Sequence, residues 1–400
     1  MRNKPKAAAF LTACGLFLAG LSILPVSADN GVSKDGKWYL REYPDDVISV
    51  SIQDKTVTEV EIPSVIDGKT ITMVEVDGFK DCVNLKSIKI PDTVTVIEDY
   101  AFYQCSSLEE VNIPQSVKNI GFQAFYGCAS LKEMKIPAAT DNIEAFAFEG
   151  CSSLPAVEIS EQNPAYKSEN GIFFDKEGKI LYLYPSAMQG TSYTVPEGCE
   201  EIYDRAFIGN PYLEHVEMRG ISKLGEDAFY YCTSLKAATV PEGIDVLKGS
   251  VFGNCTSLQN VYLPSSLTEI GDSCFYNCLG LSVCEVPESV RKIGKYAFFN
   301  CPGLTRIRLT KNTETIGDYS LGWYMGEDQK PKRLPDFTVD AEDNTAAFVY
   351  CAENSIRCTG GVTQSTVFLY IILGVVALVI ILTIVIIVVQ KKIQKRYELN

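Results

Sequence analysis

The chain has 400 residues but a single histidine, His215, and this scarcity removes several kinds of chemistry. Metal centres built on histidine clusters are excluded, and few ways remain to assemble a Ser-His or Cys-His nucleophile. The sequence also contains no G-x-S-x-G, H-E-x-x-H, P-loop or G-x-G-x-x-G motif. Because function is argued from sites, we expect a protein that is not an enzyme and that uses no metal or cofactor.

Positive charge is scarce in the body of the chain. The whole sequence has 50 acidic and 36 basic residues, a net charge of −14. Seven of the bases lie within the first six and the last ten residues; without them and Glu398, the middle has 49 acids against 29 bases, a net charge of −20. A body this acidic repels phosphate backbones, so we expect no nucleic-acid partner.

The first 28 residues have the pattern of a secretory signal peptide. Basic residues at positions 2, 4 and 6 precede an apolar stretch from Ala7 to Leu24, and Val26-Ser27-Ala28 forms a small-residue cleavage site before Asp29. A bacterial lipobox is the alternative, because Leu11-Thr12-Ala13-Cys14 places a cysteine at the position that would be lipidated. Either interpretation directs the chain out of the cytoplasm.

The other end carries one long apolar run, Val367 to Val389, which has 23 residues and no charge. At about 1.5 Å per residue a helix here reaches about 34 Å, enough to cross about 30 Å of hydrocarbon. A buried core helix is excluded by this length and by the absence of a polar face. The basic cluster within residues 390–400 predicts a cytoplasmic tail. We therefore expect a single-pass protein of the cell membrane, with its N-terminal domain extracellular.

Between these ends, an Ala-Phe motif recurs with a fixed period. Its phenylalanines are 22 or 23 residues apart over two stretches, Phe79 to Phe148 and Phe207 to Phe298. The unit is approximately L-x-x-I-x-I-P-x-x-V-x-x-I-G-x-x-A-F-x-x-C. The alternation in L-x-x-I-x-I predicts a short strand that proline ends, and A-F-x-x-C is interpreted as a helical turn over the core. The predicted fold class is α/β: a solenoid of about ten 23-residue coils with short parallel strands and helical turns, followed by one transmembrane helix.

The irregular stretches predict the domain boundaries. Residues 29–62 are rich in strand patterns and are expected to form an N-terminal β cap, and residues 63–325 form the solenoid. Within it, residues 159–196 carry two apolar runs around Asp175-Lys176-Glu177-Gly178, which predict a β-hairpin insertion on one edge. Residues 326–365 form a C-terminal cap and linker.

The unit, its length, the insertion Asp67-Gly68-Lys69 and the ending Ala346 to Asn354 resemble the BspA-like leucine-rich repeat family. The resemblance covers about residues 35–358. It implies a surface protein associated with adhesion to host or neighbouring cells. The chain differs from the commonest leucine-rich pattern in having proline after the strand and cysteine at the far turn.

Fourteen cysteines in an exported chain would ordinarily suggest disulfides. Eight of them occupy one repeat position, Asn210 fills that position once, and parallel Cβ vectors in neighbouring coils do not favour bridges. We expect reduced, buried thiols, with Cys351 and Cys358 the one pair that deserves suspicion.

The third and fifth positions of L-x-x-I-x-I point away from the core, so stacked coils build an exposed strip. Its candidate ligand-binding residues are Glu110, Glu133, Lys135, Glu158, His215, Glu217, Tyr262, Arg306 and Arg308. A solvated strand face is the alternative interpretation. A row of aromatic residues after the repeat phenylalanine, Tyr103, Tyr126, Tyr230, Tyr276 and Phe299, is a second candidate, for which packing between coils is favoured.

These features predict a membrane-anchored extracellular repeat protein that binds a protein or cell-surface ligand, in adhesion or another surface interaction. The alternative function is that of a structural or scaffold partner of other membrane or envelope proteins. Only a short linker separates the predicted cap from the predicted membrane span, and a thick cell wall would favour this alternative.

Overall fold

The computed structural model describes residues 31–343 and 345–360. The predicted signal peptide, transmembrane helix and cytoplasmic tail lie outside these residues. Within the described part, no helix has the length and apolar character needed to cross a membrane.

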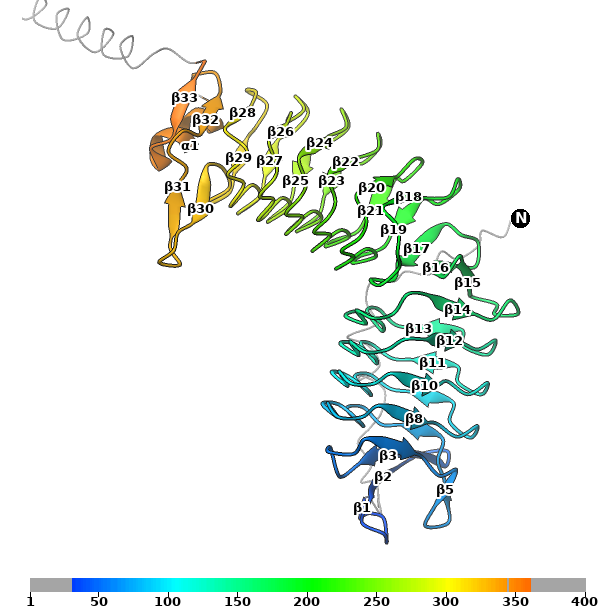
Figure 1. The fold of residues 1–400 in the computed structure, drawn as a ribbon. Helices are drawn as coiled ribbons and strands as arrows, with labels where there is room; N and C mark the ends of the chain where they lie inside the picture. The colour runs from blue at the N-terminus through cyan, green and yellow to red at the C-terminus, as the bar shows by residue number, and fades with distance from the viewer. Residues whose placement is uncertain (1–30, 344, 361–400) are drawn as a thin grey trace, which may run out of the picture.

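The chain folds into a β-solenoid of about 13 turns, bent into two arms (Figure 1). Residues 31–159 form the first arm, and residues 180–360 form the second. The number of turns exceeds the predicted ten because strands of both caps extend the parallel ladders without carrying the Ala-Phe motif.

The predicted strand L-x-x-I-x-I forms a ladder of parallel strands, which we call the first ladder. Neighbouring strands pair in register, as Ser87 with Glu110 and Thr239 with Tyr262. In the first arm its strands are β4 (Glu59–Glu61), β8 (Ser87–Lys89), β10 (Glu110–Asn112), β12 (Met134–Ile136) and β14 (Val157–Ile159). In the second arm they are β18 (Ser192–Thr194), β20 (His215–Glu217), β22 (Ala237–Thr239), β24 (Asn260–Tyr262), β26 (Val283–Cys284), β28 (Arg306–Arg308), β32 (Thr338–Asp340) and β33 (Arg357–Thr359).

The V-x-x-I segment forms a second ladder of parallel strands, which the repeat pattern did not predict. Its first-arm strands are β3 (Val47–Ile52), β7 (Met73–Val74), β9 (Val96–Ile97), β11 (Asn119–Ile120) and β13 (Asn142–Ile143). Its second-arm strands are β17 (Ile180–Leu183), β19 (Glu201–Ile202), β21 (Lys223–Leu224), β23 (Val246–Leu247), β25 (Glu269–Ile270), β27 (Lys292–Ile293) and β29 (Thr315–Ile316). Most of these strands have two residues, too few to show the alternation that identifies a strand in a sequence.

The Ala-Phe segment is not helical, so the predicted α/β class is wrong for the coils. Two residues of each turn adopt left-handed backbone dihedrals, as Ser250 (φ 51°) and Asn254 (φ 59°) do. This alternation directs every second N–H toward the next coil: Phe252 N–H donates to the Cys274 carbonyl at 2.9 Å. A helix would use these donors four residues away within its own segment. Hydrogen bonds between coils therefore replace helical ones.

The core is a stack of repeat phenylalanines covered by aliphatic residues from both ladders. Phe229, Phe252 and Phe275 are fully buried, and their ring centroids lie 5.5 and 5.6 Å apart. The repeat cysteines pack beside this stack, and each thiol from Cys105 onward donates to the carbonyl of a phenylalanine, as Cys128 Sγ does to Phe102 at 3.3 Å. Burial raises the pKa of Cys301 to about 12, so this thiol stays protonated at neutral pH. A buried, protonated thiol packs as a small hydrophobic side chain, which is the environment expected for reduced cysteines.

One coil departs from the regular repeat and lies at the bend between the two arms. Strands β16 (Ile172–Asp175) and β17 pair antiparallel on either side of Asp175–Gly178, where the sequence predicts the hairpin, and β15 (Tyr166–Glu169) pairs antiparallel with β16. The hairpin does not stand apart on one edge, since β17 joins the second ladder beside β19. Leu181 pairs with Ile202, and the Tyr184 ring stacks on Phe207 at 5.0 Å. Three positions separate Leu181 from Tyr184, whereas five separate Ile202 from Phe207, so the turn of this coil is two residues short.

Both ends of the solenoid are capped. Strands β1 (Gly31–Val32) and β2 (Trp38–Tyr43) pair antiparallel ahead of β3, and a small hairpin, β5 (Val65–Ile66) and β6 (Lys69–Thr70), extends from the first coil. At the C-terminal end lie a hairpin of β30 (Trp323–Met325) and β31 (Pro331–Arg333) and the helix α1 (Ala346–Asn354). Thr345 caps this helix by accepting from Phe348 N–H at 3.2 Å.

Candidate binding surfaces

The outward residues of the first ladder form the surface that we call the strand strip. All nine predicted residues lie on it or directly beside it, and all nine are exposed. The bend divides them into two groups: Glu110, Glu133, Lys135 and Glu158 in the first arm, and His215, Glu217, Tyr262, Arg306 and Arg308 in the second. The strip is therefore two surfaces set at an angle, because the hairpin interrupts the first ladder between β14 and β18.

Each arm has an open hollow on the strip. The first-arm hollow has a volume of about 540 Å³ and is lined by Glu110, Glu133, Lys135 and Glu158. The second-arm hollow has about 700 Å³ and contains His215, Glu217 and Arg219. Six of the nine predicted residues line these two depressions, whereas Tyr262, Arg306 and Arg308 lie outside them.

Several charges of the strip are paired with one another. Lys135 forms ion pairs with Glu133 and, at 3.9 Å, with Glu158. Arg306 contacts Asp340 of β32 at 2.7 Å. The repeat pattern did not reveal Asp340, because β32 belongs to the cap and lacks the motif. The basic end of the strip is consequently less positive than the sequence suggests.

Apolar residues are also exposed on the second-arm strip. Tyr262 is 58% exposed, and Val283 on the neighbouring strand is 47% exposed. Strand β24 pairs with β22 on one side and with β26 on the other, which holds Tyr262 in a fixed position. An exposed aromatic ring on rigid backbone is the kind of residue that anchors a protein interface.

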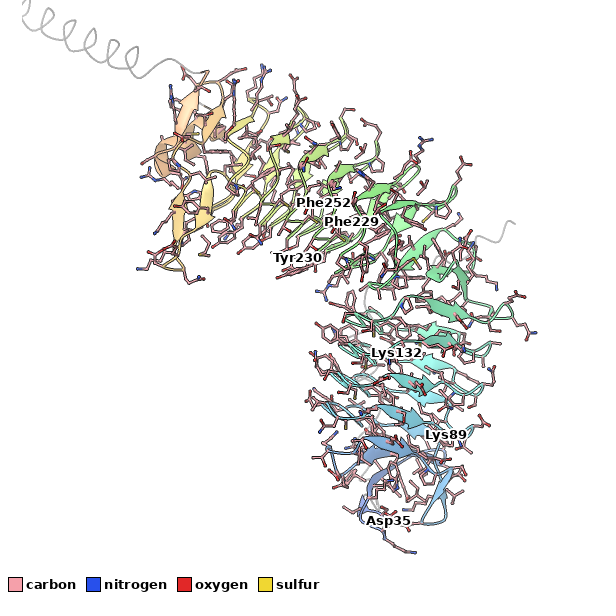
Figure 2. All side chains as sticks on the ribbon, viewed as in Figure 1. Asp35, Lys89, Lys132, Phe229, Tyr230 and Phe252 are labelled. Atoms are coloured by element: carbon pink, nitrogen blue, oxygen red, sulfur yellow. The ribbon has the colours of Figure 1, made fainter. Side chains whose placement is uncertain are left out.

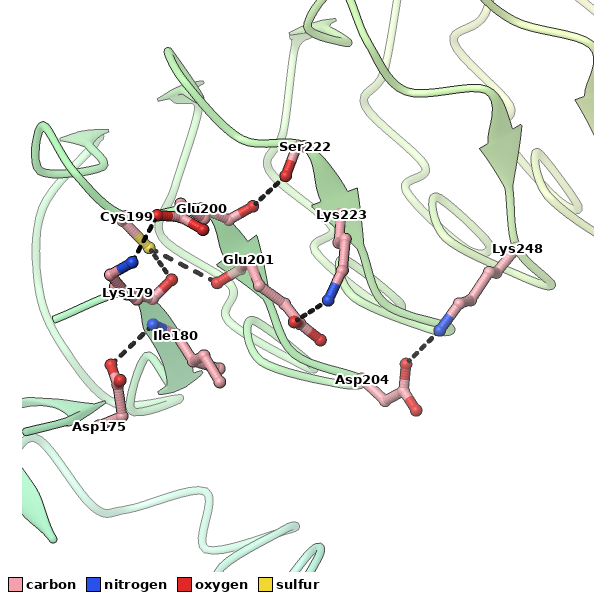
Figure 3. Close-up of polar contacts among 10 residues, drawn as sticks. All are labelled: Asp175, Lys179, Ile180, Cys199, Glu200, Glu201, Asp204, Ser222, Lys223 and Lys248. Atoms are coloured by element: carbon pink, nitrogen blue, oxygen red, sulfur yellow. Dashed lines mark hydrogen bonds and ion pairs between the residues drawn. The ribbon is translucent and has the colours of Figure 1, made fainter. Parts of the chain in front are cut away.

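Outward charges of the second ladder are also paired from coil to coil (Figure 3). Lys179 contacts Glu200 at 2.9 Å, Lys223 contacts Glu201 at 3.2 Å and Lys248 contacts Asp204 at 3.2 Å. Lys292 and Glu269 repeat the arrangement further along the second arm at 2.6 Å. On these second-arm coils the ladder presents a solvated face, and the charged groups named here already have partners.

The turn side faces the inside of the bend (Figure 1). Figure 2 shows Tyr230 there, whereas Lys89 of the strand strip lies on another side of the molecule. Of the predicted aromatic row, Tyr103 stacks on Tyr126 at 4.9 Å and Tyr276 on Phe299 at 5.5 Å. Because the faces of these rings stack on each other, packing between neighbouring coils explains why aromatic residues occupy these positions.

A second row of turn aromatics escaped the sequence analysis. It contains Tyr100, Phe122 and Phe146 in the first arm, in edge-to-face contacts of 5.5 and 5.9 Å. Tyr100 and Phe146 adopt left-handed dihedrals, with φ of 57° and 61°. Bulky residues rarely adopt this conformation, so their position is not predictable from the motif alone.

The model of the BspA type leucine rich repeat region matches residues 72–177, 187–281 and 222–322. The chain belongs to this family. Similar solved structures include a leucine-rich repeat protein from Eubacterium ventriosum, with 23% identity over 68% of this chain and 94% of that one and a TM-score of 0.46. The pneumococcal vaccine antigen PcpA has 18% identity over 80% of this chain and 96% of its own, with a TM-score of 0.51. These likenesses concern the fold alone. No curated protein matches the chain.

Proposed function

We propose that this protein is a membrane-anchored surface protein whose solenoid binds a protein or cell-surface ligand along the strand strip. The observation that carries the proposal is the strip itself: exposed, mostly polar residues recur at fixed spacing on rigid strands, with Tyr262 among them and a hollow in each arm. A rigid surface loses little conformational entropy when it binds. Membership of a repeat family built for protein contacts supports the same proposal.

The strand strip is a better candidate than the second ladder for an energetic reason. Ion pairs join neighbouring coils on both surfaces, so a partner must compete with them on either one. On the strip, Tyr262 and Val283 present apolar surface whose burial is favourable, at roughly 25 cal/mol per Å². The gain from an interface is therefore larger on the strip.

The two arms of the strip favour different contacts. Three carboxylates and one lysine surround the first-arm hollow, which suits a basic segment of the ligand. The second arm offers Tyr262 as an apolar anchor, with Arg308 exposed near its end. A ligand that contacts both arms must follow the bend.

The binding test uses the full chain and cell-surface extracts from a candidate host or neighbouring cell. The double variant Tyr262→Ala, Arg306→Glu is expected to lose most of the captured ligand while its melting temperature falls only slightly, because neither side chain faces the core and the lost Arg306–Asp340 ion pair is largely exposed. The matched control, Lys223→Ala with Lys292→Ala on the second ladder, should capture as much ligand as the unaltered chain. Equal capture by the double variant would remove the strip from consideration.

Membrane attachment has its own test. A tag after Asn400 should be protected from added protease in intact cells, and a tag at residue 30 should be cleaved, if the signal peptide and the Val367–Val389 span act as proposed. Accessibility of the C-terminal tag would refute this orientation.

A further inference from the structure

A small pocket lies at the inner corner of the bend, between the first-arm turn of residues 143–149 and the second-arm turn of residues 203–208. It exists because the intervening coil is two residues short, so that nothing fills the space between these turns. Its volume is about 60 Å³. At roughly 10–15 Å³ per water-sized sphere, this space holds the end of a side chain and not a whole metabolite. We call it the bend pocket.

Packed aromatic rings form much of the wall of the bend pocket. Tyr166 contacts Phe173 at 5.2 Å, Phe173 contacts Tyr182 at 5.1 Å, and Tyr182 contacts Tyr203 at 5.3 Å between centroids. Phe146 lines the side nearest the first arm. Because each ring is held by the next, the wall is preorganised, and aromatic faces attract cations.

The charges of the pocket are predominantly negative. Glu144, Glu149 and Asp204 line it, and Arg205 is the one cationic residue of the lining. Arg205 is already neutralised, by Glu149 at 2.9 Å and by Asp227 at 3.0 Å. Among the described residues, Glu144 has no ion-pair partner, and its side chain is exposed. A cation that enters the pocket therefore meets carboxylate charge that the protein itself does not balance.

The turn side already holds two cations of the chain against aromatic rings. Arg205 places its guanidinium carbon 4.6 Å from the centroid of Phe146. Lys80 places its ammonium 5.4 Å from Tyr100 and 5.3 Å from Tyr103. These contacts show that rings on this side of the solenoid are positioned to receive positive groups.

We propose that the bend pocket binds the ammonium end of a lysine side chain presented by a partner protein. The rings supply cation–π attraction, Glu144 supplies the balancing charge, and the small volume suits a compact ammonium better than a planar guanidinium. The partner is a protein because the pocket holds only an end group, and the two arms beside it offer surface to the rest of the molecule. The inference is independent of the strand strip, which lies on another side of the coils.

The test is saturation-transfer NMR with the full chain and blocked pentapeptides Gly-Gly-X-Gly-Gly, where X is lysine, arginine or norleucine. Saturation should be strongest at the lysine ε-methylene protons. Glu144→Gln and Tyr182→Leu should each reduce it by about two- to fivefold, as the loss of one ion-pair or cation–π contact predicts. Glu353→Gln, which removes an exposed carboxylate from α1 and lies outside both the bend pocket and the strand strip, is the matched control and should leave the signal unchanged.

Two results would overturn the proposal. Equal or greater saturation of norleucine would show that the pocket takes apolar groups without regard to charge. Unchanged lysine saturation in both pocket variants would show that lysine is attracted by the acidic surface in general. If Tyr182→Leu does not fold, Ala145→Lys provides a second test, because it places the chain's own ammonium at the pocket wall and should abolish the lysine signal, whereas Ala145→Met should not.

Discussion

The coil that contains Phe207 and the coil that contains Tyr184 have the same arrangement as far as the second ladder. They differ in the length of the turn that follows it. Both place an aliphatic residue in that ladder and an aromatic ring on the central stack. The second has two residues fewer between these points. Adjacent turns elsewhere are joined by rows of backbone hydrogen bonds, but here the flanking turns are joined by Arg205 and Glu149. The comparison shows that the strands and rings define the stack, while turn length decides whether it continues straight.

The largest expected effect distinguishes the continuous ring stack from its interrupted end. Phe252 is fully buried and stacked on both sides, so Phe252→Ala should lower the free energy of unfolding by about 3–5 kcal/mol. Phe148 is 4% exposed and stacks on Phe125 alone, at 5.9 Å. Phe148→Ala should cost less. Urea unfolding measures both, and equal losses would show that the stack does not end at Phe148.

Arg205→Ala tests the side-chain link across the bend. The substitution leaves Glu149 and Asp227, whose side chains are 10% and 17% exposed, without their cation. Because Arg205 itself is about one third exposed, we expect a loss of about 2 kcal/mol, below that of a fully buried pair. Arg205→Lys should recover part of it. Small-angle scattering should also show a change in the angle between the arms.

The pH dependence of that variant follows from Glu149. Burial raises the pKa of Glu149 above its ordinary value, and Arg205 opposes this rise. Without Arg205 the pKa in the folded state rises further above the unfolded value, so the charged form opposes folding. The stability deficit of Arg205→Ala should therefore be greatest at neutral pH and shrink as the pH falls through the raised pKa. A deficit that does not change with pH would assign the loss to packing.

The sequence predicted the first ladder well because period-two alternation and a terminal proline directly reflect a strand with one buried face. It therefore also placed Tyr262 and Glu133 on the outside correctly. The second ladder, with strands of two residues, has no such signature. The turns were mistaken for helical segments because left-handed dihedrals at Ser250 or Tyr100 are not encoded by residue type. The bend pocket was beyond prediction, since it joins residues about sixty positions apart through a two-residue deficit.

Asn210 occupies the repeat cysteine position in the coil next to the shortened turn. Its Nδ2 donates to the carbonyls of Pro185, Ser186 and Met188 at 3.2 to 3.3 Å, and its Oδ1 accepts from two backbone N–H groups. A thiol cannot replace these bonds. Asn210→Cys, although it restores the repeat consensus, should lower the free energy of unfolding by about 1–3 kcal/mol. A gain in stability on thermal or urea unfolding would contradict this account of the short coil.

Cys128→Ala tests the regular form of that position. It removes one buried sulfur and its hydrogen bond to the Phe102 carbonyl, and should cost about 1–2 kcal/mol without preventing folding. Mass spectrometry of the unreduced protein provides the companion measurement. If several repeat cysteines were found bridged, packing would not be what holds the coils together here.

The smallest expected effect separates binding from stability. Tyr262→Ala removes a side chain that is 58% exposed on a strand held from both sides, so the free energy of unfolding should change by less than about 0.5 kcal/mol. Tyr126→Ala, at a ring stacked on Tyr103 inside the bend, should cost more because it opens a packed contact. If Tyr262 anchors a ligand, its loss weakens binding alone, whereas loss of Tyr126 lowers stability with little effect on that ligand. The opposite pattern would move the docking surface from the strand strip to the inside of the bend.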